Sequence, residues 1–238
     1  MQQKAFADHA VLTFDVVGTC IDFEAGIASA VEQIAGPSSE LDRATVLEAF
    51  GRAEDRQQHE TPQLPFTQML EPIYNRLAHD LGLPEGPAEA AALRASIPAW
   101  PAFPDSADAL SRLATRFHLV ALTNADRWAL EQMSATLGSP FDDGVTAEDV
   151  GVNKPSPRVF DYCRGRLSAH GYRLTDIGHV AQSQYHDIAA AKNLGYQVCW
   201  VERRRHKPGW GATPEPSGTV VPDLHVGSLE ELATAMGL

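Results

Sequence analysis

The stretch Ala10-Val11-Leu12-Thr13-Phe14-Asp15-Val16-Val17-Gly18-Thr19 contains the pattern that decides the fold. It begins with an apolar run, which stops at an acid and is soon followed by a glycine that permits a tight turn. Three later runs, over 118–123, 177–181 and 197–201, are also short and largely apolar rather than alternating. Such runs are typical of strands that are buried on both faces of a parallel sheet.

Helical patterns fill the gaps between these runs. Apolar residues recur with helical spacing over 106–115, 127–137, 157–167 and 186–194. A regular alternation of strands with helices is the pattern of βαβ units. The sequence therefore predicts an α/β fold, with a Rossmann-like and mostly parallel sheet at its core.

One long segment departs from this alternation. Residues 23–97 contain no convincing strand, only helical patterns over 25–35, 41–57, 66–81 and 87–96. An insertion directly after the first strand would cover the carboxyl edge of the sheet, where ligands of open α/β sheets bind. We therefore predict a Rossmann-like catalytic core from residues 1–22 and 100–238, and a helical cap from residues 23–99.

Composition and charge exclude several classes of protein. The 238 residues carry 19 Lys and Arg against 31 Asp and Glu, and a net charge of −12 disfavours binding to nucleic acid. No apolar run approaches the roughly 20 residues of a membrane span, and no secretory signal is visible. Three widely spaced cysteines fit neither a disulfide framework nor a zinc site. We therefore expect a cytoplasmic protein that acts without a membrane.

Polar residues follow the predicted strands at the points where chemistry would be placed. Asp15 ends the first strand, Thr123 and Asn124 end the second, Lys154 precedes a proline-marked helix start, and Asp187 opens a helix after a later strand. Each has an ordinary structural explanation, as a cap, a turn residue or a solvated charge. Together, in this order and at one edge of the sheet, they predict a catalytic site.

This order resembles the haloacid dehalogenase superfamily. Its members carry a nucleophilic Asp after the first strand, Ser or Thr after the second, then a Lys, and an acid after the fourth. The resemblance covers residues 9–22 and about 102 to the end, and the helical insertion matches the cap of that superfamily. It implies that Asp15 is the nucleophile of a hydrolase.

Two departures from the phosphatase pattern select a branch. Val17 stands where phosphatases of the superfamily place a general acid, and a poor leaving group needs such an acid. Gln182 stands where metal-dependent members have the first acid of an acidic pair. We therefore predict no metal and no cofactor. The resemblance is closest to the type II, or (S)-2-haloacid, dehalogenases.

The resemblance implies roles for the residues at the strand ends. Lys154 is expected to hold Asp15 ionised, because an opposite charge nearby favours the carboxylate. Thr123 is expected to bond the Asp15 or substrate carboxylate, and Asn124 to contact the leaving group. Asp187 would orient Lys154 or the hydrolytic water.

Further residues are expected to bind the substrate. The backbone N–H groups near Val16 and Val17 would receive its carboxylate, and Arg52 matches the position from which family members supply an arginine. The long amide of Gln184 would fill space around the water. His186 is a candidate proton carrier, because its unperturbed pKa lies near neutrality.

Three hypotheses remain beside a 2-haloacid dehalogenase that acts on a small-molecule carboxylate. The same nucleophile could open a small cyclic imino acid, in which case the ring amine would need a proton donor. The chain could instead be a magnesium-dependent phosphatase of small molecules, or a catalytically idle binding module. A homodimer is compatible with the resemblance.

Overall fold

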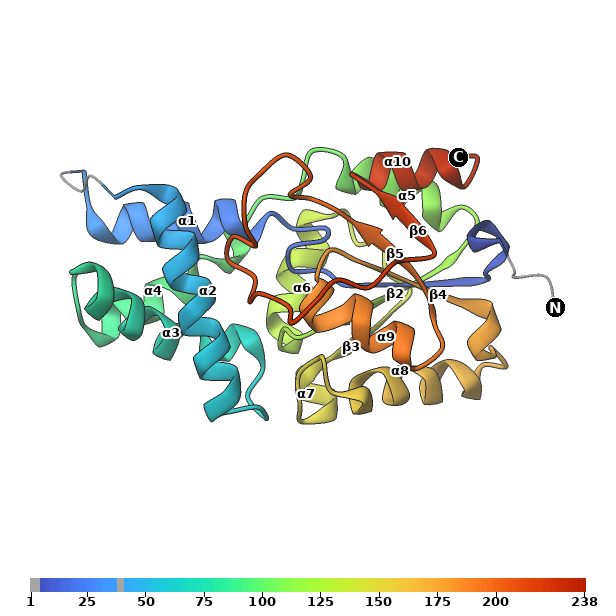
Figure 1. Ribbon diagram of the computed structural model, residues 1–238, viewed down its shortest axis with the longest axis horizontal. Helices are drawn as coiled ribbons and strands as arrows, with labels where there is room; N and C mark the ends of the chain where they lie inside the picture. Colours follow the sequence, from blue (N-terminus) through green and yellow to red (C-terminus); the bar gives the residue numbers. More distant parts are fainter. Residues whose placement is uncertain (1–4, 38–40) are drawn as a thin grey trace.

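A six-stranded parallel sheet lies at the centre of the computed structural model, which describes residues 5–37 and 41–238 (Figure 1). The strands run in the order β3-β2-β1-β4-β5-β6, so the first strand in the chain is central in the sheet. Their bounds are β1 Val11–Phe14, β2 His118–Thr123, β3 Asp143–Thr146, β4 Ile177–Ala181, β5 Gln197–Val201 and β6 Leu224–Val226. The prediction of an α/β fold with a mostly parallel sheet is confirmed.

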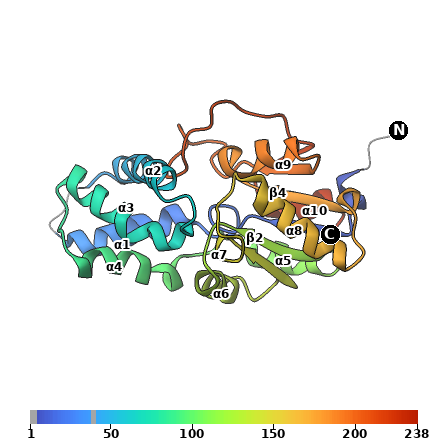
Figure 2. The same ribbon diagram turned by 90° about the horizontal axis from the view of Figure 1, so that it is seen from below.

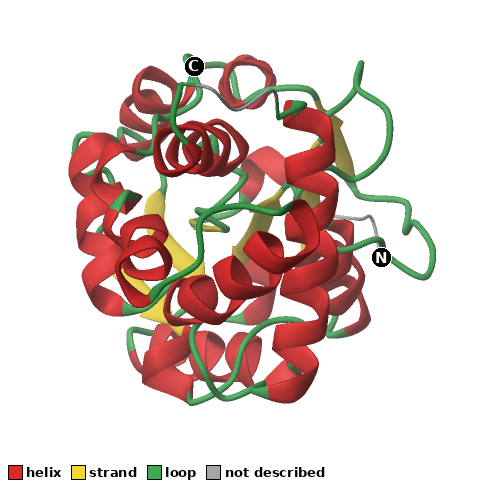
Figure 3. Cartoon of the chain, turned by 90° about the vertical axis from the view of Figure 1, so that its left-hand side faces the viewer, coloured by secondary structure: helices red, strands yellow, loops and turns green. Residues whose placement is uncertain are grey.

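Helices cover both faces of this sheet (Figures 2 and 3). One face packs against α5 (Ser106–Ala114), α6 (Arg127–Thr136) and α10 (Leu229–Ala235). The other packs against α8 (Pro157–Ala169) and α9 (Ala189–Asn193), while the short α7 (Ala147–Val150) follows β3. Because both faces are covered, the central strands bury every side chain, which explains their unbroken apolar runs.

Two strands escaped prediction, and both lie at an edge of the sheet. β3 has the sequence Asp-Gly-Val-Thr and β6 the sequence Leu-His-Val, so neither forms an apolar run. An edge strand has a neighbour on one side only and is short and partly exposed here. The burial that marks the central strands in the sequence is therefore missing.

Four inserted helices separate β1 from β2 in the sequence and gather at one end of the molecule, on the left of Figure 1. They are α1 (Phe23–Ala35), α2 (Arg43–Glu60), α3 (Phe66–Leu81) and α4 (Pro87–Ala95). Each coincides with a predicted helix. α1 begins directly after Asp22, because the side chain of that residue accepts a hydrogen bond from Ala25 N at 3.0 Å and caps the helix.

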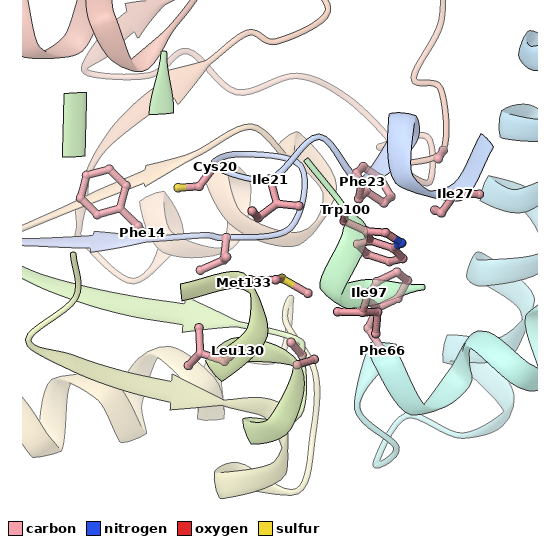
Figure 4. Close-up of a cluster of buried hydrophobic side chains, with 14 of the residues drawn as sticks. Phe14, Cys20, Ile21, Phe23, Ile27, Phe66, Ile97, Trp100, Leu130 and Met133 are labelled. Carbon is pink, nitrogen blue, oxygen red and sulfur yellow. The ribbon is translucent and has the colours of Figure 1, made fainter. Parts of the chain in front are cut away.

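An apolar cluster joins the inserted helices to the sheet (Figure 4). Trp100, where the chain returns to the sheet, is almost fully buried and lies against Gly26 of α1. A β-carbon at Gly26 would lie 2.3 Å from the indole ring, so the close approach requires glycine. The Trp100 Nε1–H donates to Ser96 Oγ at 2.9 Å, which fixes the ring at this junction.

Candidate active site

Asp15 stands directly after β1, at the carboxyl edge of the sheet. Its main-chain N–H still belongs to the ladder and donates to Val180 O at 3.0 Å, so a rigid strand fixes the residue. Gly18 has a φ of +87°, which folds the next loop back toward the strand. Thr19 Oγ1 therefore returns to donate to Asp15 Oδ2 at 2.6 Å, and it accepts from Gln182 N at 2.8 Å.

Lys154 lies fully buried between two carboxylates. Its Nζ donates to Asp15 Oδ1 at 2.9 Å, to Asp187 Oδ1 at 2.7 Å and to Leu122 O at 2.8 Å. An ammonium group has three N–H donors, so all of them are engaged. The structure thus brings together the three charged residues that the sequence placed at different strand ends.

Thr123 and Asn124 make hydrogen bonds that support the main chain beside the site. The Asn124 amide donates to Lys154 O at 3.0 Å and accepts from Lys154 N at 2.6 Å, so it holds the main chain of that residue. The Thr123 hydroxyl is buried and accepts from Ala125 N at 3.2 Å. The Thr123 hydroxyl does not bond Asp15, whereas Asn124 also lines the small cavity over Asp15, so its contact with a leaving group stays a prediction. The hydroxyl that binds Asp15 belongs to Thr19.

A buried histidine, which the sequence analysis did not identify, holds Asp187. His179 Nε2 lies 3.0 Å from Asp187 Oδ1, and its Nδ1 lies 2.9 Å from the hydroxyl of Thr13. Thr13 and His179 are register partners on β1 and β4. Two polar residues inside otherwise apolar strands were the signal that could have revealed this pair.

The two carboxylates experience different electrostatic environments. Burial raises the pKa of Asp15, and the opposing effects of Lys154 and the Thr19 hydroxyl do not cancel this rise. Burial acts on Asp187 too, but Lys154 and His179 outweigh it and lower the pKa of Asp187 to about 2. Burial also disfavours the charged form of Lys154, yet the two carboxylates together raise its pKa. Asp187 is therefore the permanent anion, and Asp15 keeps the basicity that a nucleophile needs.

A cavity of about 30 Å³ lies over Asp15, with room for about one or two water molecules. Asp15, Val17, Lys154 and Asp187 line it from the side of the sheet. The inserted helices contribute Phe23, Phe66 and Glu54 to the opposite wall. Glu54 is a site residue that the sequence analysis missed, although buried polar residues recur along α2 with Gln57 and Gln58.

Of the predicted substrate contacts, Arg52 and Gln184 lie away from the cavity, and the role of the Val16 N–H stays a prediction. Val16 is buried in the apolar core, and its carbonyl accepts from the main chain of the same loop, whereas Val17 does line the cavity. Arg52 is exposed and lines a separate groove of about 900 Å³ between α2 and the 204–215 loop. Gln184 is turned away, because its amide both donates to and accepts from the main chain of Val220.

His186 belongs to a hydrogen-bonded chain that joins the sheet to α2. Its Nδ1 lies 3.2 Å from Ser183 Oγ and its Nε2 lies 3.0 Å from Gln58 Oε1. The Gln58 amide in turn donates to Glu54 Oε1 at 2.9 Å. Burial lowers the pKa of His186 to about 4, so it is neutral near pH 7 and does not have the near-neutral pKa expected of a proton carrier.

Burial of His186 predicts a pH-dependent stability. The unfolded chain protonates this histidine below its ordinary pKa of 6.5, whereas the folded chain does so only below about 4. Between these values the unfolded state binds more protons at this site, so the contribution of His186 to stability falls as the pH falls, by about 3 kcal/mol over the window. Urea unfolding from pH 7 to pH 4 should show that His186→Gln removes this loss. The exposed His170→Gln should keep it, and an unchanged slope in His186→Gln would contradict the assignment.

The side chains around Asp15 and Asp187 offer few free oxygen ligands for a divalent cation. Magnesium prefers several hard oxygen ligands in octahedral geometry. Here the two facing carboxylates are both engaged by Lys154, and the neighbouring position is the amide Gln182. Within residues 5–37 and 41–238, no three His, Cys, Asp or Glu side chains cluster as metal ligands would. The residues present therefore do not fit a resident divalent cation.

The site places an Asp, held by a buried Lys, at the carboxyl edge of a Rossmann-like parallel sheet, beside an inserted set of helices. Residues 9–195 match the sequence profile of haloacid dehalogenase-like hydrolases. The chain belongs to this family of hydrolases. Among the described residues, no helix has both the length and the apolar character needed to cross a membrane.

The individual relatives that match this chain include both dehalogenases and phosphatases. An (S)-2-haloacid dehalogenase of Pseudomonas putida is 32% identical over 105 residues, or 43% of this chain and 44% of that protein. A phosphoserine phosphatase of Thermus thermophilus is 30% identical over 143 residues, or 58% and 53%. The chain thus spans about half the length of the curated relatives it matches.

Solved structures extend the likeness to the whole fold. The L-2-haloacid dehalogenase of Xanthobacter autotrophicus superposes with a TM-score of 0.77 at 21% identity, covering 96% of this chain and 98% of that one. The sheet and the inserted helices are therefore shared, which accounts for the arrangement that positions Asp15.

Proposed function

We propose that the protein hydrolyses short 2-substituted carboxylic acids through an ester on Asp15, most simply as an (S)-2-haloacid dehalogenase that yields a 2-hydroxy acid. The observation that carries the proposal is a buried carboxylate of raised pKa, oriented by Thr19 and Lys154 and open to a small cavity. The similarity to an (S)-2-haloacid dehalogenase supports the choice of halide as leaving group.

The reaction would proceed in two steps. Asp15 attacks the α-carbon of the substrate, the bond to the leaving group breaks, and that group departs with the bonding electrons. Water then attacks the Asp15 side-chain carbonyl carbon, which releases the 2-hydroxy acid and restores the carboxylate. Asp187 Oδ2 is buried and has no hydrogen-bond partner in the part of the chain that the structure describes. Because a buried acceptor normally finds a partner, this oxygen is the natural place to orient the water.

We infer that the four inserted helices act as a cap. The cavity is smaller than any substrate of this class, so part of its wall must move for a substrate to enter. Glu54, Phe23 and Phe66 reach the cavity from these helices and would move with them. A cytoplasmic location and a homodimer stay predictions of the sequence.

A second candidate is the opening of a small cyclic imino acid by the same nucleophile. The observation that favours it is the buried carboxyl of Glu54 on the wall that faces Asp15. A halide departs as a stable anion and needs no proton, whereas a ring nitrogen departs as an amine. An acid at this position would serve the second reaction and not the first.

A panel of substrates tests the proposed function. It contains (S)-2-chloropropionate, small cyclic imino acids and an aryl phosphate, each assayed with magnesium and with a chelator. We expect a 2-hydroxy acid from at least one 2-substituted acid, at the same rate under both conditions. Turnover of the phosphate alone, with loss of activity in the chelator, would contradict the proposal and favour a magnesium-dependent phosphatase.

A further inference from the structure

Glu54 is a buried carboxyl that neither step at Asp15 employs. It lies on α2, is 4% exposed, and lines the same cavity as Asp15, Lys154 and Asp187. Its Oε1 accepts from the Gln58 amide at 2.9 Å, which leaves Oε2 to carry a proton when the group is neutral. Burial, with a further contribution from Asp55, raises its pKa well above the ordinary value.

The other ionisable proton donors that line the cavity, Lys154 and His186, are engaged. All three N–H groups of Lys154 donate to Asp15, Asp187 and the main chain. His186 lies within hydrogen-bond distance of Ser183 through one ring nitrogen and of Gln58 through the other. Glu54 is the acid that the inserted helices contribute to the described lining of the cavity.

The charges of the cavity point to the kind of group that departs. Asp15, Asp187 and Glu54 line it together with a single cation, Lys154, and its described lining contains no arginine. With Glu54 neutral, the empty site carries a net charge of about −1, and an anionic halo acid would bring this to about −2. A substrate that is both carboxylate and ammonium adds no net charge. Its ammonium N–H groups can donate hydrogen bonds to the Glu54 carboxyl.

We propose that Glu54 shares a proton with a leaving nitrogen, so that the site accepts strained cyclic 2-imino acids in addition to, or in place of, 2-halo acids. This inference rests on the proposed attack of Asp15 at the α-carbon. The bond from an Asp15 oxygen to the α-carbon forms while the bond from the α-carbon to nitrogen breaks. Nitrogen takes the bonding pair and keeps the proton that it shared with Glu54, so it departs as a neutral amine on the opened chain. No oxidant or further reactant is needed.

The test compares leaving groups on one carbon skeleton. Wild-type protein and Glu54→Gln are assayed with (S)-2-chlorobutanoate and with azetidine-2-carboxylate, both of which carry a carboxylate on a four-carbon chain. Glutamine keeps the size of the side chain and the acceptor for Gln58 but has no acidic proton. Glu48→Gln, an exposed residue of the same helix, is the matched control. Covalent labelling of Asp15 is followed by mass spectrometry for each substrate.

We expect Glu54→Gln to lose about 10² to 10⁴ in the rate of ring opening and to lose far less in the rate of chloride release, where the wild type supports it. Glu54→Asp should recover part of the ring opening, and Glu48→Gln should match the wild type. Absence of ring opening in the wild type, or an equal loss of both reactions in Glu54→Gln, would overturn the role of Glu54. If no substrate labels Asp15 in the wild type, the proposed function itself fails, which is a separate result.

Discussion

Asp15→Asn should abolish turnover of every substrate, with a fall in kcat of at least about 10⁴-fold. An amide oxygen is a far weaker nucleophile than a carboxylate. Among the described carboxyls, Asp15 is the one that accepts hydrogen bonds from both Thr19 and Lys154. Asparagine keeps one acceptor oxygen, which can bind Lys154, while its NH₂ group faces the Thr19 hydroxyl, an oxygen that can accept; the bonds to Asp15 that these replace measure 2.9 and 2.6 Å. The variant should therefore fold, and steady-state product formation measures the loss.

Asp22→Asn is the matched control for this substitution. Asp22 lies at the end of the same loop, but its side chain caps α1 and does not line the cavity. Asparagine is an equally good N-cap, so the control should keep full activity. Full turnover in Asp15→Asn would rule out covalent catalysis by this residue.

Lys154→Met should produce the largest loss of stability, about 3 to 5 kcal/mol in the free energy of unfolding. The substitution leaves Asp15 and Asp187 buried without the cation that both of them bind. Like charges at this separation cannot both stay ionised, so one carboxylate must take up a proton. Activity should fall with stability, because Asp15 loses both its orienting donor and its charge.

Denaturant unfolding of Lys154→Met, compared with Lys207→Met, measures this effect. Lys207 is exposed, so its replacement should change the free energy of unfolding by no more than about 0.5 kcal/mol. A loss below about 1 kcal/mol in Lys154→Met would show that the buried ion pairs contribute little to the folded state. If Lys154→Met fails to fold, the absence of a cooperative unfolding transition agrees with the expected loss of stability.

The sequence alone was sufficient to predict the α/β fold and to predict that three charged residues lie together at its centre. Buried parallel strands leave unbroken apolar runs, and the carboxyl ends of such strands meet at one edge. Asp15, Lys154 and Asp187 could therefore be placed together before any coordinates. Edge strands and side-chain directions leave weaker traces, which is why β3, β6 and the orientation of Thr123 were not foreseen.

The residues of the inserted helices show where sequence reasoning ends. Arg52 and Glu54 are two positions apart on α2, which turns them about 200° from one another around the helix axis. Only one of them can face the sheet, and the way the helix packs decides which. Arg52 was expected to bind the substrate because it matches a position from which family members supply an arginine. The buried face of α2 instead carries Glu54, Gln57 and Gln58.

A single turnover in H₂¹⁸O, with protein in excess over a substrate from the panel, tests the central claim most directly. Water that attacks the ester carbonyl leaves its oxygen in the carboxylate, so the peptide containing Asp15 should carry ¹⁸O while the first 2-hydroxy acid does not. Heavy oxygen found in the product, with an unlabelled Asp15 peptide, would contradict the account, because water would then have attacked the substrate itself.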